Sequence, residues 1–312
     1  MSKSRSLPVA GNRTKKISVK PFAAALGAFV ECDDLRFVDG DAKREIHQAW
    51  LDHLVLVFRG QKLTNQDLLQ VSEIFGTTTK SATAPSRGLY EDIAIVSNVM
   101  KDGKPLGVLG AGELLWHSDH SFEEAPLAAA LLYAVEVPPV GGDTHFCNMY
   151  LALDTLPAPL RARVQGLTIK NDGSHNSAGE RRTNDVVTDL QSYVGASHPI
   201  IRTHPETEAD VLYLGRRPNA YVNGLSVQES EELLNALWAH ATQPRFTWAQ
   251  RWQVGDLVVW DNRCTMHRRD AFDGKARRVM HRAQCAGERP FHDPHLAGRS
   301  HARGKAAPGV TA

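Results

Sequence analysis

Short apolar runs bounded by turn residues recur along the chain and predict β-strands. The runs at 54–60 and 93–99 are rich in β-branched residues and are bounded by Gly, Asp or Asn. The run at 128–137 ends, whatever its type, at a Pro-Pro and a Gly-Gly pair, and the segments 256–262 and 277–285 are further strand candidates. No G-x-G-x-x-G or Walker-type loop accompanies these runs, which argues against alternating βα units around a nucleotide.

Three stretches have the spacing of amphipathic helices. The segments 41–53 and 65–75 follow Asp or Thr-Asn caps. The segment 226–242 is the clearest, because Ser226 opens it and Glu229 stands three residues later, as in a capping box. The pattern as a whole predicts an antiparallel β core with several flanking helices.

Composition excludes some classes of protein. Of the 312 residues, 42% are hydrophobic and 23% are charged, which is ordinary for a soluble globular protein. The formal net charge of +1 argues against a surface that binds nucleic acid. No stretch approaches the ~18 consecutive apolar residues of a membrane span. The four cysteines are scattered without a C-x-x-C pair, which favours reduced thiols and a cytoplasmic location.

One domain over residues 17–286 is the economical interpretation, because the chain has no internal repeat and no long linker. Residues 1–16 are basic and lack the apolar run of a secretory signal, so they predict a flexible N-terminus. Residues 287–312 are rich in Gly, Ala, Arg and His without periodicity, and they predict a flexible tail.

The stretch LWHSDHSF contains a candidate metal site. His117 and Asp119 stand at i and i+2, and on an extended segment such side chains share a face, whereas His120 falls on the other face. Alone, this pattern is weak. A facial site of two histidines and one carboxylate needs another histidine from a neighbouring strand, and His267 follows the run at 256–262 through a short polar turn. Three such ligands on one side of Fe(II) leave the opposite side open.

Two arginines strengthen this interpretation. Arg278 lies eleven residues after His267, and Arg282 lies four residues further on, so both share one face of a strand. Two buried cations near a metal contribute little to stability, but each fits a carboxylate that its guanidinium binds bidentately. One could hold 2-oxoglutarate and the other an anionic substrate.

These motifs together resemble the TauD/TfdA family of Fe(II)/2-oxoglutarate-dependent dioxygenases. The resemblance covers about residues 18–290 and is carried by four ordered motifs, WHSD (116–119), PPVGGDT (138–144), WDNRCTMH (260–267) and RRVMHR (277–282). The TfdA branch (2,4-dichlorophenoxyacetate dioxygenase-like) is the most similar. The fold that the resemblance implies is a double-stranded β-helix, a cupin-like jelly roll that is mainly β with flanking helices, which agrees with the predicted core.

The resemblance also implies roles for particular residues. It implies that His117, Asp119 and His267 bind Fe(II), and that Thr144 and Arg278 hold the far carboxylate of 2-oxoglutarate. Arg282 matches the position that pairs with the substrate's acidic group. The implied reaction uses O₂, releases CO₂ and succinate, and hydroxylates a small anionic molecule. Relatives are often dimers or tetramers, so a homo-oligomer is expected.

Departures from the family bear on the substrate. The histidine that the TauD branch carries after residues 74–76 has no counterpart, and Glu113 replaces an asparagine, which argues against taurine. Lys80 stands where the TfdA branch has a lysine before a Pro-Ser-Arg, and it is either a carboxylate contact or a solvated loop lysine. The polar segment 170–197 suits an active-site lid, in which His175 and residues 180–182 line the pocket or lie on the surface.

Three alternatives to ether cleavage of an aryloxyalkanoate stay open. The chain could hydroxylate an amino acid or another biosynthetic metabolite. Two histidines and a carboxylate also suit Zn²⁺ in a hydrolase, although a hydrolase has no need of Thr144 and an arginine pair. A binding protein that kept the fold and lost the chemistry is a third class, and the complete ligand set argues against it. Trp116 and Trp260 are expected to be core aromatics beside the site.

Overall fold

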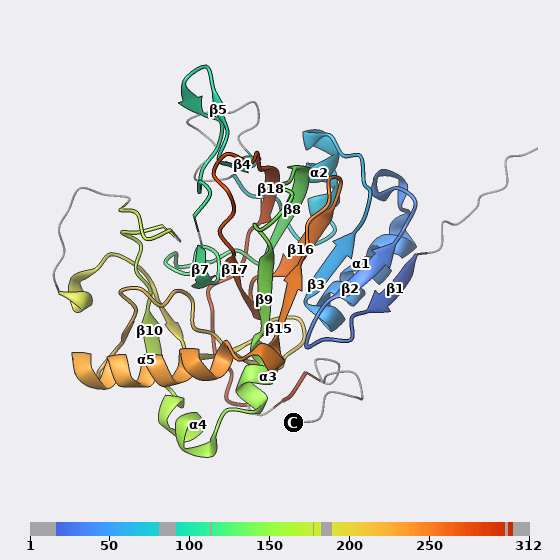
Figure 1. Ribbon diagram of the computed structural model, residues 1–312. Helices are drawn as coiled ribbons and strands as arrows, with labels where there is room; N and C mark the ends of the chain where they lie inside the picture. The colour runs from blue at the N-terminus through green and yellow to red at the C-terminus, as the bar shows by residue number, and fades with distance from the viewer. Residues whose placement is uncertain are drawn as a thin grey trace, which may run out of the picture.

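Two facing β-sheets form the centre of the molecule (Figure 1). The computed structural model describes residues 17–80, 92–112, 114–176, 178–181, 189–296 and 299–301. In this part of the chain, the larger sheet has the strand order β1 (Ser18–Pro21), β2 (Ala28–Glu31), β3 (Val55–Phe58), β16 (Leu257–Asp261), β8 (Ala129–Glu136), β18 (Val279–Cys285), β4 (Ala94–Ser97). The smaller sheet has the order β15 (Thr247–Gln250), β9 (Thr144–Asn148), β17 (Thr265–Arg269), β7 (Leu114–His117).

The four predicted strands lie in the larger sheet, as β3, β4, β16 and β18, which confirms those predictions. The run at 128–137, whose type the sequence left open, is β8 of the same sheet. The pairing of these strands is antiparallel, and only the contact of β2 with β3 among the pairs of this sheet is parallel. The chain crosses directly from the larger to the smaller sheet between β8 and β9 and again between β16 and β17. Strands that alternate between two facing antiparallel sheets make a jelly roll.

The apolar faces of the two sheets enclose one core. Val258 and Trp260 of β16 and Met280 of β18 meet Phe146 of β9 there, all fully buried or nearly so. Trp260 therefore belongs to the core, as predicted, whereas Trp116 is partly buried and packs at its margin. The space that remains open between the sheets contains the candidate site.

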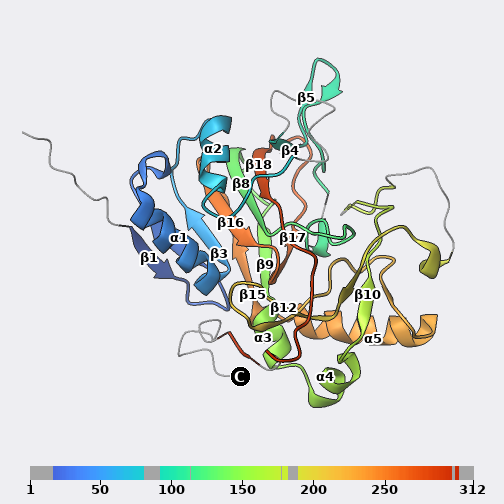
Figure 2. The ribbon, with the colours of Figure 1, turned by 180° about the vertical axis from the view of Figure 1, so that it is seen from behind.

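Helices cover the outer face of the larger sheet (Figures 1 and 2). These are α1 (Gly40–His53) and α2 (Asn65–Ser72), and η1 (Leu35–Phe37) is a 3₁₀ turn before them. Asp39 caps α1 by accepting from the backbone N–H of Ala42 at 2.9 Å, and Thr64 begins α2 with a capping box. The α2 helix ends at Ser72, earlier than predicted, because residues 73–75 continue as a turn.

A second group of elements closes one end of the sheets. Its helix α5 (Val227–Ala241) has the predicted capping box between Ser226 and Glu229. The other elements are α3 (Met149–Asp154), α4 (Ala158–Val164), η2 (Leu190–Ser192), η3 (Pro244–Phe246), the sheet β11 (Ser197–Pro199), β10 (Thr168–Lys170), β14 (Tyr221–Val222) and the pair β12 (Ile201–Thr203) and β13 (Asp210–Leu212). A hairpin of β5 (Met100–Lys101) and β6 (Lys104–Pro105) projects from the opposite end (Figure 1). Among the described residues, no helix has the length and apolarity needed to cross a bilayer.

The described part of the tail after residue 286 makes contacts with the body of the protein. The carbonyl of Phe291 accepts from Thr203 N at 2.7 Å, and that of Arg299 accepts from Asp210 N at 3.0 Å. The ring of His301 is buried and stacks on Tyr150 at 4.5 Å. Local composition could not reveal these contacts, because every partner is distant in sequence.

Candidate metal centre

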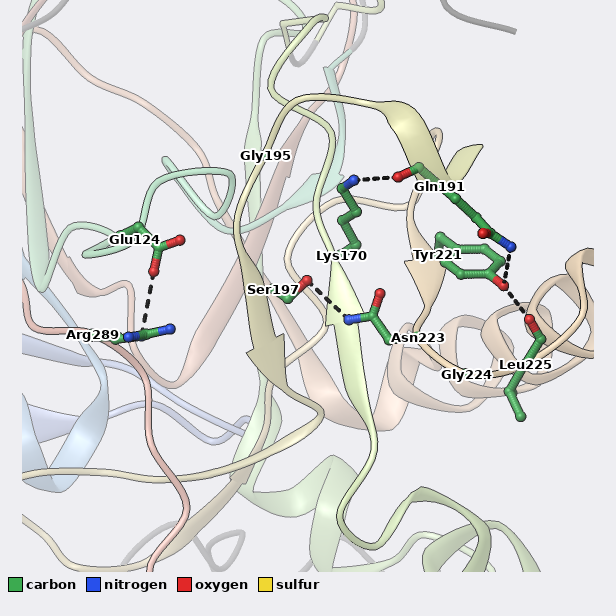
Figure 3. A pocket seen from close by; sticks show the side chains of 10 residues that line it. All are labelled: Glu124, Lys170, Gln191, Gly195, Ser197, Tyr221, Asn223, Gly224, Leu225 and Arg289. Carbon is green, nitrogen blue, oxygen red and sulfur yellow. Dashed lines mark hydrogen bonds and ion pairs between the residues drawn. The ribbon is translucent and has the colours of Figure 1, made fainter. Parts of the chain in front are cut away.

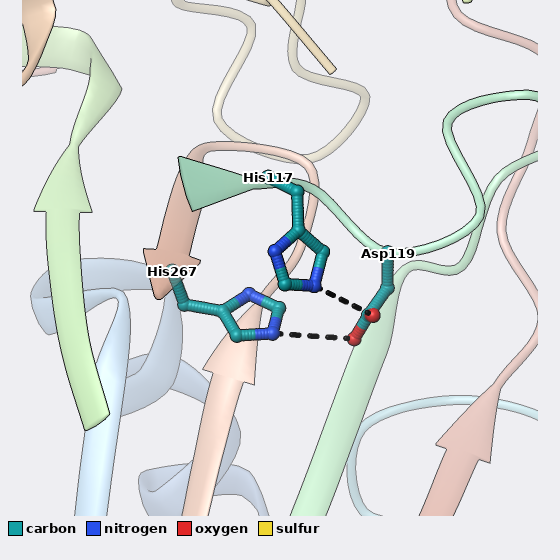
Figure 4. A group of neighbouring side chains, drawn as sticks. All are labelled: His117, Asp119 and His267. Carbon is teal, nitrogen blue, oxygen red and sulfur yellow. Dashed lines mark ion pairs between the residues drawn. The ribbon is translucent and has the colours of Figure 1, made fainter. Parts of the chain in front are cut away.

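Neighbouring strands bring two histidines side by side. His267 on β17 is directly opposite His117 on β7, and the two rings lie 4.2 Å apart between centroids. The β7 strand ends at His117, so Asp119 lies in the turn beyond it rather than on a continuing strand. Figure 4 shows both rings pointing toward the Asp119 carboxylate. The structure therefore brings together the three predicted ligands.

Their spacing fits a single cation. Asp119 Oδ1 is 3.6 Å from His117 Nε2, and Oδ2 is 3.8 Å from His267 Nε2. All three ligand groups offer atoms within 4.8 Å of one another. Two ligands at about 2.1 Å from one ion and at right angles to each other are roughly 3 Å apart, so small adjustments would complete the coordination.

The protonation states also fit a cation. Leu115 O lies 2.6 Å from His117 Nδ1, which therefore carries the proton and leaves the Nε2 lone pair toward Asp119. Burial, reinforced by the neighbouring histidine, lowers the pKa of His267 to about 3, so its ring is neutral. Burial raises the pKa of Asp119, but Arg282 and the two histidines outweigh it and hold that pKa well below its usual range.

The Asp119 carboxylate is buried, at 5% exposure. Its Oδ2 has no hydrogen bond among the described residues, and Arg282, whose Nη2 lies 3.2 Å away, balances its charge. The chemistry of the three donor side chains is therefore what fits a cation here. Two neutral imidazoles and one carboxylate are the donors that a 2-His-1-carboxylate iron site uses, and they occupy one side of the ion.

Asn262, which the sequence analysis did not single out, holds Asp119 in place through its backbone. Its Oδ1 accepts from Asp119 N at 2.7 Å, and its Nδ2 donates to Asp119 O at 2.9 Å. A further bond from Nδ2 to Leu127 O at 2.9 Å fixes the amide itself. One signal of this role was present in the sequence, the position of Asn262 inside the 260–267 motif. The sequence could not show the contact with Asp119, which is 143 residues away in the chain.

Thr144 and Arg278 lie together, as the sequence predicted for two residues of one site. Thr144 Oγ1 accepts from Trp252 Nε1 at 3.0 Å, and the Arg278 guanidinium carbon is 6.0 Å from the centre of the Trp252 ring. Arg278 precedes β18, is 2% exposed, and has no partner for its Nε among the described residues. Burial first, and Arg269 second, lower the pKa of Arg278 to about 9.

Arg282 reaches the same site from β18. Its Nη2 is 3.2 Å from Asp119 Oδ2, which compensates the charge of that carboxylate. The Gln284 amide, with its oxygen turned toward the arginine, accepts from Arg282 Nε at 3.0 Å. A bulge between Val279 and Met280 intervenes, yet both arginines face the same cavity.

The cavity between the sheets has a volume of about 330 Å³. One part of its wall is apolar and the other is polar and cationic. The apolar lining consists of Ala94, Val96, Val108, Leu109, Leu114, Leu132 and Trp260. The polar lining comprises His117, Asp119, His120, Thr144, Asn176, Arg216, His267, Arg269, Arg278, Arg282 and Gln284. The sequence analysis missed Arg216 and Arg269, because neither belongs to a spacing that signals chemistry on its own.

Other candidate residues lie at the margin of this cavity or outside the description. Lys80 is exposed and is not part of the cavity lining, and the following residues 81–91 lie outside the described part of the chain. Glu113 and Arg182 are likewise outside it. From the predicted lid, Asn176 lines the cavity.

Two further residues of the predicted lid, His175 and Asp172, make local contacts. His175 Nδ1 lies 2.7 Å from Asp172 Oδ2, and the carbonyl of His175 accepts from Arg216 Nη1 at 2.5 Å.

His120 was expected on the face away from the predicted ligands, but it lines the cavity. It lies in the turn after β7, where its φ is 56°.

A second buried group of potential ligands, His204, Asp261 and Cys264, already has its hydrogen bonds satisfied. His204 Nδ1 accepts from two backbone N–H groups, at 3.3 and 3.1 Å, and Nε2 donates to Asp261 at 3.0 Å. Arg263 binds both oxygens of Asp261 at 2.9 and 2.8 Å. This group is a structural ion network under the turn that leads to β17.

A larger hollow, of about 650 Å³, lies beside β10 and has mostly polar walls (Figure 3). Its charged side chains have partners within the lining: Lys170 Nζ donates to the backbone carbonyl of Gln191 at 2.6 Å, and Arg289 pairs with Glu124 at 3.4 Å. The residues that line this hollow do not converge on a common point as His117, Asp119 and His267 do, so the smaller cavity between the sheets is the functional candidate.

Comparison with known proteins decides the family. The profile described as "Taurine catabolism dioxygenase TauD, TfdA family" matches residues 18–284. The chain belongs to this family. An alpha-ketoglutarate-dependent 2,4-dichlorophenoxyacetate dioxygenase of Cupriavidus pinatubonensis is 37% identical over 279 residues, which cover 86% of this chain and 96% of that protein. A pentalenolactone F synthase of Streptomyces arenae is 35% identical over 260 residues, which cover 78% and 87%.

Comparison with solved structures supports the same family. AAD-2 in complex with Mn(II) and N-oxalylglycine has a TM-score of 0.73 and 32% identity, covering 88% of this chain and 99% of that one. This member of the TauD/TfdA family is thus a 2-oxoglutarate-dependent dioxygenase with a cupin-like jelly-roll fold, and the predictions of family, fold and enzyme class are confirmed.

Proposed function

We propose that this dioxygenase couples the oxidation of 2-oxoglutarate to the hydroxylation of a small organic acid, with His117, Asp119 and His267 as the iron ligands. The convergence of two histidine rings and the buried Asp119 carboxylate, whose ligand atoms lie within 4.8 Å of one another, carries the proposal. Bound Fe(II) would supply the activation of O₂, of which one atom ends in succinate and the other in the hydroxylated product, with CO₂ released.

Thr144 and Arg278 suit the far carboxylate of 2-oxoglutarate. The guanidinium provides a fork of N–H donors, and the threonine hydroxyl, which already accepts from Trp252, can donate its own proton to a carboxylate oxygen. Both side chains are buried, at 4% and 2% exposure, so a carboxylate placed here would be shielded from water and would neutralise Arg278.

The shape and polarity of the cavity support an amphiphilic anion as the substrate. Arg282 beside Asp119 offers an anchor for an acidic group, while the apolar side chains of β4, β7 and β8 offer a wall for an apolar body. An aryloxyalkanoate has both parts, and the relative from Cupriavidus pinatubonensis is named for such a substrate. Hydroxylation of the carbon that bears the ether oxygen gives a hemiacetal, which breaks down to a phenol and a carbonyl acid.

The apolar wall also serves the chemistry. It excludes water from the reacting carbon, while Asn262 keeps the Asp119 backbone fixed and the Leu115 carbonyl keeps the His117 ring in one tautomer.

The test is an anaerobic titration of the Fe(II)-loaded protein with 2-oxoglutarate, followed by its visible charge-transfer band. We expect a band in the wild type and in His145→Ala, and none in His117→Ala or His267→Ala. His145 is the matched control because it lies on β9 and pairs with Asp270 at 2.7 Å instead of lining the cavity. Tight Zn²⁺ binding without a band would instead support the hydrolase alternative and refute the proposal.

Substrate class is tested by adding O₂ and counting succinate against product. Aryloxyacetates should give one succinate per phenol released, with little succinate in their absence. Equal coupling to an amino acid, and none to aryloxyacetates, would favour the biosynthetic alternative.

A further inference from the structure

Arg269 lies directly across from Thr144. The two are Cα partners in the antiparallel register of β17 and β9, so their side chains leave the sheet on the same face with Cβ atoms about 5 Å apart. Both line the cavity between the sheets, and so does Arg278. The register therefore puts a second arginine beside the two residues proposed to hold the far carboxylate of 2-oxoglutarate.

Backbone carbonyls and one aromatic ring hold the Arg269 side chain, whose guanidinium carbon lies 5.4 Å from the centre of the Phe272 ring. Its Nη2 donates to the carbonyls of Leu109 and Gly110, each at 3.0 Å, and to that of Gly112. These bonds fix the guanidinium and satisfy one of its nitrogen atoms. Its Nε is buried and has no hydrogen-bond partner among the residues that the structure describes.

Charge makes this arrangement unusual. Arg269 and Arg278 are 4% and 2% exposed, and in the described part of the chain neither forms an ion pair with an acidic side chain. Neighbouring Arg268 shows the ordinary alternative, because it points to the other face of β17 and pairs with Asp270 at 2.5 Å. Two adjacent buried cations without an acid are costly, and an anion bound between them removes the cost.

We propose that Arg269 is a further 2-oxoglutarate-binding residue that donates, together with Arg278 and Thr144, to the far carboxylate of the cosubstrate. The proposal rests on the proposed function, since it needs 2-oxoglutarate to bind in this cavity. Thr144, Arg269 and Arg278 would then select a five-carbon oxo acid that ends in a second carboxylate. Monocarboxylic oxo acids lack the group that the two arginines bind.

The experiment compares two ligands that differ only at this end. Calorimetric titration of anaerobic Fe(II)-loaded protein measures Kd for 2-oxoglutarate and for 2-oxopentanoate, which has a methyl group in place of the far carboxylate. Arg269→Met and Arg269→Lys are the variants, and Arg268→Met is the matched control on the opposite face of the same strand. We expect Arg269→Met to raise the Kd of 2-oxoglutarate at least tenfold, or about 1.4 kcal/mol, and that of 2-oxopentanoate less than twofold.

Each other outcome has a separate meaning. Equal weakening of both ligands would mean that Arg269 acts only by holding residues 109–112, and would overturn the proposal. So would a Kd for 2-oxoglutarate unchanged from that of Arg268→Met. If Arg269→Met fails to fold, Arg269→Lys decides, since it keeps the charge and loses the fork and should still weaken 2-oxoglutarate selectively. A wild type that binds no 2-oxoglutarate would refute the proposed function itself.

Discussion

Replacing Asn262 by alanine should loosen Asp119, the proposed metal ligand, without changing any atom of the three proposed ligand side chains. The Asn262 side chain is fully buried and makes three hydrogen bonds, two to the backbone of Asp119 and one to that of Leu127. Alanine removes all three partners at once. The Asp119 N–H and two carbonyls then stay buried without them.

The magnitude follows from those three groups. Leaving one buried polar group unsatisfied costs about 1–3 kcal/mol, so three give an upper range of roughly 3–9 kcal/mol. Water that enters the space left by the amide reduces this, and we expect the free energy of unfolding to fall by about 3–4 kcal/mol. Loss of a group that orients a ligand typically weakens metal binding about 10–100-fold, and we expect a loss in that range.

Two measurements separate the effects. Urea unfolding of the metal-free protein gives stability, and competition with a chelator gives the Fe(II) or Mn(II) affinity of the folded protein. Asn223→Ala is the matched control, because that amide also makes two side-chain bonds, to Thr168 at 2.8 Å and Ser197 at 3.0 Å, but lies away from the cavity lining. A metal affinity equal to that of the control, despite lower stability, would refute the view that Asn262 positions Asp119.

Three further predictions concern Arg282 as the proposed substrate anchor, a glycine with a positive φ, and stability in acid. Arg282→Met should raise KM for an acidic substrate about tenfold or more, measured in steady-state assays, while the Kd of 2-oxoglutarate changes less than twofold. Gly215→Ala should lower the free energy of unfolding in urea by about 2 kcal/mol or more, because φ is +67° and an added Cβ would lie 1.9 Å from Asn171 Oδ1. A hydrogen bond from His47 lowers the pKa of Glu206 to about 2, with Arg263 adding to the effect against burial. Stability from that carboxylate is present above its unfolded pKa of about 4.3 and is lost as pH falls toward 2. Urea unfolding between pH 5 and 2 should therefore show a flatter loss for Glu206→Gln than for the wild type.

The sequence predicted best the features that depend on residues close together in the chain. The strands at 54–60 and 256–262 are continuous apolar runs because β3 and β16 are buried on both faces, between the core and the outer helices. The capping box at Ser226 is likewise a contact between residues three positions apart. Where partners are distant, as for the described residues after 286, local composition carries no signal of the contacts.

The same difference between local and long-range contacts explains which site residues the sequence could predict. His117, Asp119 and His267 were recognisable because the i, i+2 pair and the later histidine form part of ordered motifs. Arg269 was not, although it is only two residues from His267, because its importance depends on the register of β17 against β9. Asn262 depends in the same way on a turn 143 residues away.

The residues that violate the rules of stable packing are the ones that indicate function here. Arg269 and Arg278 are buried, line the same cavity and have no acidic partner in the described part of the chain. A fold selected for stability alone would replace such arginines with apolar side chains of similar size. Keeping the two arginines makes sense if Fe(II) and the dianion 2-oxoglutarate bind in the cavity, because the bound dianion would offset the cost of burying the two positive charges. Fe(II) and 2-oxoglutarate together should then raise the melting temperature by more than the sum of their separate effects. The reason is that the cation and the dianion attract each other within one cavity, so each strengthens the binding of the other.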